Sequence, residues 1–142
     1  MLKLLIAVDG SEHAHRAIDA AVRLAKETTV ECVLVHVREG ADAYHGDITP
    51  RDYERIGSEA RARQDAILAE ALTYARQAGL ADATTLAQAG SPEIDLPHVA
   101  TQRGVDMIVM GTRGLGTMGA LLLGSVAQRV VHHASVPVLL VK

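Results

Sequence analysis

The chain has 142 residues, a formal net charge of −3 at pH 7, three Tyr, one Cys and neither Phe nor Trp. Its basic residues form no continuous tract and few aromatic rings could stack on bases, so the composition argues against a DNA or RNA partner. No apolar stretch approaches the roughly 18 residues of a membrane span, and the N-terminus lacks a signal-peptide pattern. We therefore expect one cytoplasmic domain, residues 1–142, with no membrane insertion.

The N-terminal part of the chain alternates strand and helix. Apolar residues from Leu2 to Val8 predict a strand that ends at Asp9, and Ser11 is expected to cap a helix whose apolar positions continue to Ala25. A second strand is predicted from Val30 to Val37. Strand, helix and strand at these lengths indicate a parallel βαβ unit, in which ligands bind beyond the carboxyl ends of the strands.

The middle of the chain combines a loop, a long helix and an edge strand. Small polar residues from Glu39 to Thr49 predict a loop at the mouth of the crevice that the strand ends form. A helix dense in Arg, Glu and Ala is expected from Arg51 to Ala78, and an edge strand from Thr84 to Gln88. The helix should turn one apolar stripe inward: Ile56, Ala60, Ile67, Leu68, Ala71, Leu72 and Ala75.

A further helix is predicted after this strand. Ser91 provides its cap and Pro92 its first turn. Pro97 lies inside the helical pattern, where a proline removes a backbone hydrogen bond at a cost of about 3 kcal/mol in a regular helix. We therefore expect this helix to be kinked or to begin later than Pro92.

The apolar run Met107 to Met110 predicts a strand buried on both faces, and a glycine-rich segment from Gly111 to Ser125 follows it. Ser125 is expected to cap the next helix, Val126 to His133. Strand, glycine loop and helix start in this order favour a phosphate, because backbone N–H groups point inward and the helix dipole attracts negative charge. No Asp or Glu follows Asp106 in the sequence.

Three phosphate-binding patterns overlap in this segment. The Walker A spacing from Gly119 to Ser125 places Ser where the Lys must be. The pattern G-x-G-x-x-G from Gly114 to Gly119 lacks the acidic residue about 20 positions further on that a dinucleotide site needs. The third pattern, G-x2-G-x9-G-[S/T], fits from Gly111 to Ser125 without a gap. It resembles the ATP-binding signature of the universal stress protein family.

The resemblance covers nearly the whole chain. Segments similar to the landmarks of the family follow in order at Leu4 to Ser11, Val35 to Val37, Gly90 to Pro92 and Ser135 to Val141. The strand and helix pattern predicts a doubly wound, Rossmann-like α/β fold with five mainly parallel strands and helices on both faces. The resemblance implies the strand order 3-2-1-4-5, a crevice between the first and fourth strands, and ATP as ligand. Mg²⁺ would come with the phosphates, and Asp9 could assist in holding it.

The predicted ATP site combines residues that follow three strands with residues that open one helix. Backbone groups around Val37 would hold the adenine, Asp9 the ribose, and the glycine loop with the helix start the phosphates. The full set is Ala7, Val8, Asp9, Val37, Met110, Gly111, Arg113, Gly114, Gly124, Ser125 and Val126.

We therefore predict a stress-response or regulatory protein that signals by bound ATP and has no catalytic residues. A slow ATP hydrolase is the alternative, which the missing Walker Lys and the single carboxylate of Asp9 disfavour. His36 is the one candidate base, and strand alternation directs it to the sheet interior. An Asp-phosphorylated receiver domain is a further alternative, but its second acid and its phosphoacceptor are missing.

The last predicted strand, Val136 to Val141, is apolar and lies at the edge of the sheet. Such an edge presents unpaired N–H and C=O groups, so we expect a homodimer through this strand, with Pro137 outside the paired stretch. A regulatory role is compatible with a protein partner, which the sequence does not identify.

Overall fold

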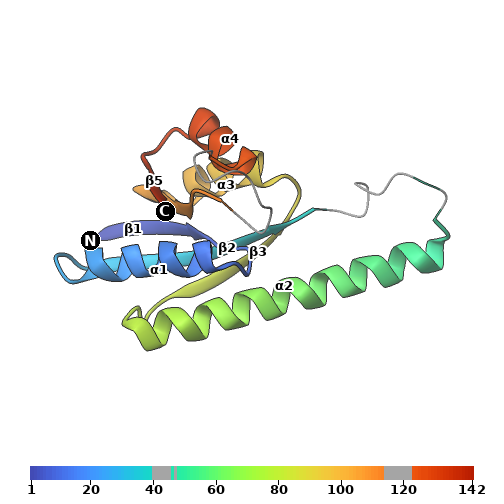
Figure 1. Cartoon of the computed structure of the whole chain (residues 1–142), viewed down its shortest axis with the longest axis horizontal. Helices are drawn as coiled ribbons and strands as arrows, with labels where there is room; N and C mark the ends of the chain where they lie inside the picture. The colour runs from blue at the N-terminus through green and yellow to red at the C-terminus, as the bar shows by residue number, and fades with distance from the viewer. Residues whose placement is uncertain (40–45, 47, 114–122) are drawn as a thin grey trace.

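The computed structural model of the chain describes residues 1–39, 46, 48–113 and 123–142, so Gly114 and most of the predicted loop at 39–49 lie outside it. The strands are β1 (Leu2–Ala7), β2 (Val30–Arg38), β3 (Thr84–Ala89), β4 (Met107–Gly111) and β5 (Val138–Val141). The helices are α1 (Glu12–Ala25), α2 (Pro50–Ala78), α3 (Pro92–Gln102) and α4 (Ser125–His133) (Figure 1).

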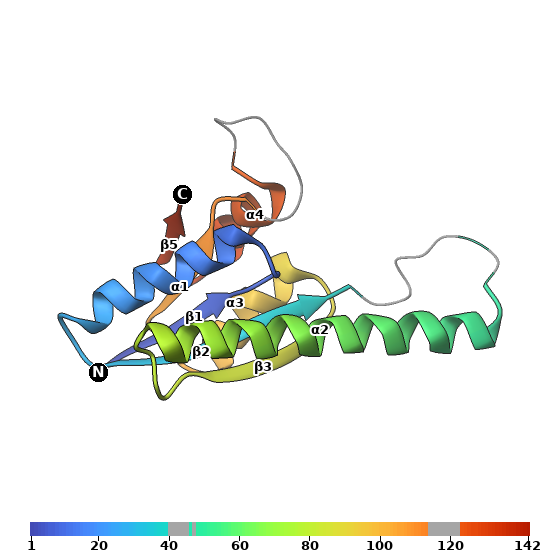
Figure 2. The ribbon, with the colours of Figure 1, turned by 60° about the horizontal axis from the view of Figure 1, so that its bottom comes forward.

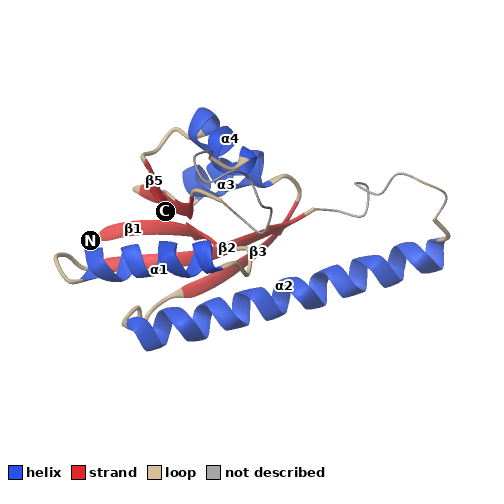
Figure 3. Cartoon of the chain, viewed as in Figure 1, coloured by secondary structure: helices blue, strands red, loops and turns tan. Residues whose placement is uncertain are grey.

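All strand pairs are parallel, and the sheet has the predicted order β3-β2-β1-β4-β5. Helices α1 and α2 cover one face, while α3 and α4 cover the other (Figure 3). Because side chains alternate along a strand, Leu4 and Ile6 of β1 pack in the core under α1 and α2, whereas Leu5 packs in the core under α3 and α4. Covering both faces accounts for the nearly continuous apolar runs of the central strands.

Helix α2 is longer than the sheet that it covers. Its 29 residues span about 43 Å at 1.5 Å per residue, against about 30 Å for the nine residues of β2. Its buried side chains therefore begin only at Gln64, and the part before Gln64 runs past the carboxyl ends of the strands (Figure 2). The predicted inward stripe is wrong for Ile56 and Ala60, which are half-buried on this projecting part.

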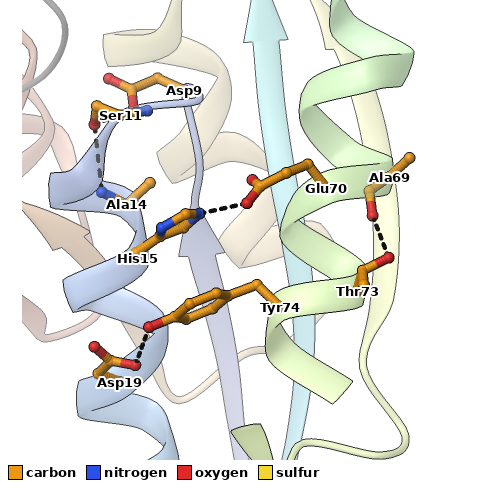
Figure 4. Close-up of polar contacts among 9 residues, drawn as sticks. All are labelled: Asp9, Ser11, Ala14, His15, Asp19, Ala69, Glu70, Thr73 and Tyr74. Atoms are coloured by element: carbon orange, nitrogen blue, oxygen red, sulfur yellow. Dashed lines mark hydrogen bonds and ion pairs between the residues drawn. The ribbon is translucent and has the colours of Figure 1, made fainter. Parts of the chain in front are cut away.

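A polar contact joins α1 to α2. The ring of His15 stacks on that of Tyr74 with centroids 4.1 Å apart, and His15 Nε2 lies 2.7 Å from Glu70 Oε1 (Figure 4). The Tyr74 hydroxyl donates a hydrogen bond of 2.8 Å to Asp19 Oδ1, which raises the pKa of Tyr74. These groups are partly exposed, so they add little stability but fix the position of α2 along α1.

Several element boundaries differ from the sequence predictions. Helix α3 begins at Pro92 and includes the buried Pro97, so a later start is wrong. Strand β5 begins at Val138, because Pro137 donates no hydrogen bond and contributes only its carbonyl, which accepts from Ile108 N at 2.9 Å. Strand β1 ends at Ala7 rather than Val8.

Candidate functional site

A cavity of about 540 Å³ opens at the carboxyl ends of β1, β2 and β4. It lies where the strand order reverses between β1 and β4, the usual ligand position in open α/β sheets, and its volume is typical of small-molecule sites. Every predicted site residue that the structure describes lines it: Ala7, Val8, Asp9, Val37, Met110, Gly111, Arg113, Gly124, Ser125 and Val126. Gly114 lies outside the described residues.

Other residues line the cavity that the sequence had not assigned to it. They are Ala14, Val35, His36, Glu39, Pro92, Leu96, Thr112 and Ala127. Pro92 and Leu96 come from the start of α3, which follows the carboxyl end of β3 and so reaches the same edge of the sheet. The position of this helix directly after a predicted strand could have identified Pro92 and Leu96 as site residues. Glu39 adds a second carboxylate to the wall, besides Asp9.

Asp9 is held in the turn between β1 and α1. The Ser11 hydroxyl and the Ser11 N–H donate to Asp9 Oδ1 at 2.5 and 3.0 Å, while Ala14 N–H donates to Ser11 Oγ at 3.3 Å (Figure 4). Ser11 thus caps α1 as predicted and also fixes the carboxylate. Since both bonds from Ser11 use Oδ1, and the described residues make no hydrogen bond to Oδ2, the second oxygen remains available for a ligand.

The backbone of Val37 points into the space beyond β1. The last hydrogen bond between β1 and β2 among the described residues runs from Val8 N–H to Val35 O, at 2.9 Å. Residues two apart in a strand direct their N–H and C=O groups toward the same neighbour, so those of Val37 extend past the end of β1. Val37 therefore offers one donor and one acceptor, side by side, at the cavity wall.

Gly111 permits a close approach of β4 to α1. A Cβ atom at this position would lie 2.7 Å from His13 Cβ, closer than carbon atoms pack, and 3.1 Å from the His13 carbonyl oxygen. The next residue is fixed as well, since Thr112 N–H donates to Val141 O at 3.0 Å. The start of the glycine loop is thus anchored on both sides, by α1 and by β5.

Helix α4 begins one residue earlier than expected. Gly124 is its N-cap, with φ −61° and ψ 153°, and its carbonyl accepts from Gln128 N at 3.1 Å. The prediction that Ser125 caps this helix is therefore wrong: Ser125 is its first residue. Gly124 N–H donates to Thr112 O at 2.7 Å, which joins the two ends of the glycine loop and fixes where the helix starts.

The start of α4 has the properties of an anion site. The first N–H groups of a helix have no partner within the helix, and Ser125, Val126 and Ala127 all line the cavity. No acidic residue lies in the first turn of α4, and Arg113 adds a positive charge to the same wall. Negative charge would thus be stabilised at this end of the cavity.

His36 occupies the position that strand alternation predicted, on the sheet face covered by α2. Its Nδ1 lies 3.1 Å from Gln64 Nε2 of α2. Burial lowers the pKa of His36, although the nearby carboxylate of Asp9 opposes this shift, so the ring is neutral at pH 7. Across the ranges that the structure describes, no group of three or more His, Cys, Asp or Glu residues could hold a metal ion, and no helix could span a membrane.

Comparisons with known proteins agree on one family. The profile of the Universal stress protein family matches residues 1–142. Universal stress protein YxiE of Bacillus subtilis is 34% identical over 146 residues, covering 99% of this chain and 98% of that protein. The structure of universal stress protein UspA from Lactobacillus plantarum superposes with a TM-score of 0.85 at 22% identity, covering 99% and 97% of the two chains. A universal stress protein crystallised with cAMP has a TM-score of 0.74 and 27% identity, covering 99% and 97%.

Proposed function

The chain belongs to the universal stress protein family, and from this membership and the geometry of the cavity we propose that it is a regulatory protein that binds ATP between β1 and β4. One observation carries the proposal. The ends of β1, β2 and β4 and the start of α4 supply a carboxylate, a backbone donor and acceptor, and an anion site around a single cavity. Adenosine triphosphate has parts that match each of these in turn.

The adenine would lie against Val37. Its N1 atom accepts hydrogen bonds and its amino group donates them, which complements the N–H and C=O of the Val37 backbone. Asp9 Oδ2 would accept from the ribose hydroxyl groups, as Oδ1 is already engaged by Ser11. The universal stress protein crystallised with cAMP supports an adenine nucleotide as the ligand class.

The phosphates would lie between the glycine loop and the first turn of α4. A chain of three phosphates is proposed rather than one, because Gly111, Gly124, Arg113 and the start of α4 extend the anion site along the cavity wall. Mg²⁺ would bind chiefly to phosphate oxygens and water, and we propose Asp9 as its one ligand from the protein.

A regulatory role is proposed in preference to ATP hydrolysis. Hydrolysis requires a group that orients the attacking water and cations that stabilise charge on the γ-phosphate. The ring of His36 contacts Gln64 and is not placed to activate water. The remaining candidates in the described cavity wall are the carboxylates of Asp9 and Glu39. Glu39 is the one observation that favours a slow hydrolase as second candidate, because it is a second carboxylate at the mouth of the cavity.

The test of the proposal is the identity of the bound ligand. The protein is purified from cells and denatured, and any nucleotide released is identified by chromatography and mass spectrometry. Calorimetry with ATP, ADP, AMP and cAMP then measures which phosphate length binds best. We expect ATP to be recovered and to bind most tightly. Recovery of a flavin or a nicotinamide nucleotide, or no binding of any adenine nucleotide at millimolar concentration, would overturn the proposal.

We further propose a homodimer through β5. This strand is at the sheet edge, and its four residues are apolar and half-buried. A second copy related by a two-fold axis would satisfy the free edge and cover these side chains. Light scattering should give the mass of a dimer at micromolar concentration, and Leu139→Asp should give a monomer. Val131→Asp, on the exposed surface of α4, is the matched control. A monomer in the unsubstituted protein would refute the dimer.

A further inference from the structure

Gln64 of α2 is a buried amide in an otherwise apolar contact between helix and sheet. Its side chain is 3% exposed, and its buried neighbours along the helix are Leu68, Ala71 and Ala75. Among the described residues, the other buried polar side chain is that of Ser11, which the turn at Asp9 explains. Burial of an amide is unfavourable unless its hydrogen bonds are made, so the contacts of Gln64 indicate its role.

Gln64 joins the carboxyl ends of β2 and β3. Its Nε2 donates to the carbonyl oxygens of His36 and Gln88 at 3.0 and 2.8 Å, and lies 3.1 Å from His36 Nδ1. Backbone carbonyls only accept, which fixes the amide with its nitrogen toward the strands. Strand β1 ends at Ala7, opposite Val35 of β2. The contacts of Gln64 with β2 and β3 therefore lie beyond the end of β1. The amide therefore secures the part of β2 that β1 no longer supports.

The same contact selects one form of the His36 ring. The two amide protons of Gln64 go to the carbonyl oxygens of His36 and Gln88, so a proton on His36 Nδ1 would point at a nitrogen, 3.1 Å away, that can only donate. The neutral ring with its proton on Nε2 is therefore favoured. Burial acts in the same direction, since it lowers the pKa of His36.

We propose that Gln64 is a positioning residue for base selection: by holding the carbonyl and the ring of His36, it fixes the backbone of the adjacent Val37. This inference rests on the proposed function. Guanine presents a donor at N1 and an acceptor at O6, the reverse of adenine, so a rigid N–H and C=O pair at Val37 discriminates between the two bases. A mobile strand end would shift to accommodate guanine, and the discrimination would fall.

A second contact of α2 supports this role. The position of a Cβ at Gly10 would lie 3.3 Å from Ile67 Cγ1, so α2 packs on the turn that carries Asp9 as well as on the end of β2. Gln64 and Ile67 are three residues apart and thus neighbours on one helix face. One face of α2 therefore holds both the base side and the ribose side of the proposed site.

The experiment compares Gln64→Met with Gln77→Met, a matched change at an exposed position of the same helix. Calorimetry measures the ratio of ATP to GTP affinity in each protein. We expect this ratio to fall about tenfold in Gln64→Met, the equivalent of roughly one hydrogen bond, and to stay unchanged in Gln77→Met. A purely structural role would lower both affinities together. A folded Gln64→Met protein that keeps the ATP to GTP ratio of the unsubstituted protein would overturn the inference.

A second measurement needs no substitution. Nitrogen-15 NMR of the unsubstituted protein reports which ring nitrogen of His36 carries the proton at pH 7.5. The proton on Nε2 supports the inference, and a proton on Nδ1 overturns it, even where Gln64→Met does not fold. Absence of ATP binding by the unsubstituted protein would instead overturn the proposed function, and the two failures are thus distinguishable.

Discussion

Replacing Gly124 by Val should weaken ATP binding while leaving the protein folded. The backbone at Gly124 has φ −61°, which every residue adopts, so conformation does not require glycine here. Space does: a Cβ would lie 3.2 Å from Thr112 O and 3.4 Å from Arg113 Cα. The loop backbone must move by a few tenths of an ångström, and the two Val methyl groups enlarge this shift.

The size of the effect follows from what moves. Overpacking of this kind costs about 1–3 kcal/mol of stability, which a folded domain tolerates. Thr112 and Arg113 both line the cavity, and displacing them misaligns the proposed phosphate contacts. Loss of one hydrogen bond to a charged group is worth about 1.5–3 kcal/mol, or roughly 10- to 150-fold in affinity.

Calorimetry with ATP on Gly124→Val and Gly124→Ala should show a graded loss, larger for Val. Gly57→Ala is the matched control, because a Cβ there meets only the flexible end of Arg61, at 3.4 Å, on the projecting part of α2. It should leave the affinity unchanged and stabilise the helix by about 0.5–1 kcal/mol. Unchanged ATP affinity in a folded Gly124→Val protein would refute the proposed position of the phosphates.

Three other predictions follow from the site and the core. Asp9→Ala should weaken ATP binding by roughly 1.5–3 kcal/mol in calorimetry, whereas equal affinities would remove Asp9 from the site. Steady-state phosphate release should give a turnover well below about 1 s⁻¹, the lower end of typical enzymes, and a rate above that value would favour the hydrolase. Cys32 is 4% exposed and burial raises its pKa to about 11, so iodoacetamide at pH 8 should modify it only after unfolding in urea; rapid labelling of the folded protein, detected by mass spectrometry, would contradict this.

The parts of the fold that were predicted correctly depend on local patterns. Apolar runs and helical spacing located each strand and helix that the structure describes, because an element has to bury one face and the period of its apolar residues reveals which face. The strand order 3-2-1-4-5 was inferred from the resemblance to the family, and the structure confirms it. The boundaries were less accurate: β5 begins only after Pro137, which has no N–H to donate, and α4 begins after Gly124, whose N–H donates to the distant Thr112 O.

The error at α2 has a physical cause of the same kind. The stripe from Ile56 to Ala75 has one continuous helical period, so sequence alone assigns all of it to the core. Burial also requires an opposing surface, and the sheet ends near Gln64. How far a helix extends past its sheet depends on the lengths of other strands, which the helix sequence does not encode.

The candidate site divides in the same way. Asp9, Gly111 and Gly124 were predictable because each meets a local requirement, a carboxylate after a strand or a glycine where backbones approach. The support of Asp9 is also local, since Ser11 two residues on holds it, but the other supports are distant: His13 lies against Gly111, and Gln64 secures the end of β2. A Gln within a charged helix carries no pattern that identifies it as buried, so only the packing of α2 on β2 and β3 could reveal it.

These supports give α1 and α2 a shared role in the site. At the amino end of α1, Ser11 holds Asp9 and His13 lies against Gly111, while Gln64 of α2 secures the end of β2 and Ile67 packs on the turn that carries Asp9. The two helices are joined by the contact of His15 with Glu70 and Tyr74 (Figure 4). Because both ends of the proposed nucleotide depend on this pair, a shift of α2 along α1 would change the distance between base and phosphate contacts. The cavity is therefore set by the packing of two helices as much as by the strand ends that line it.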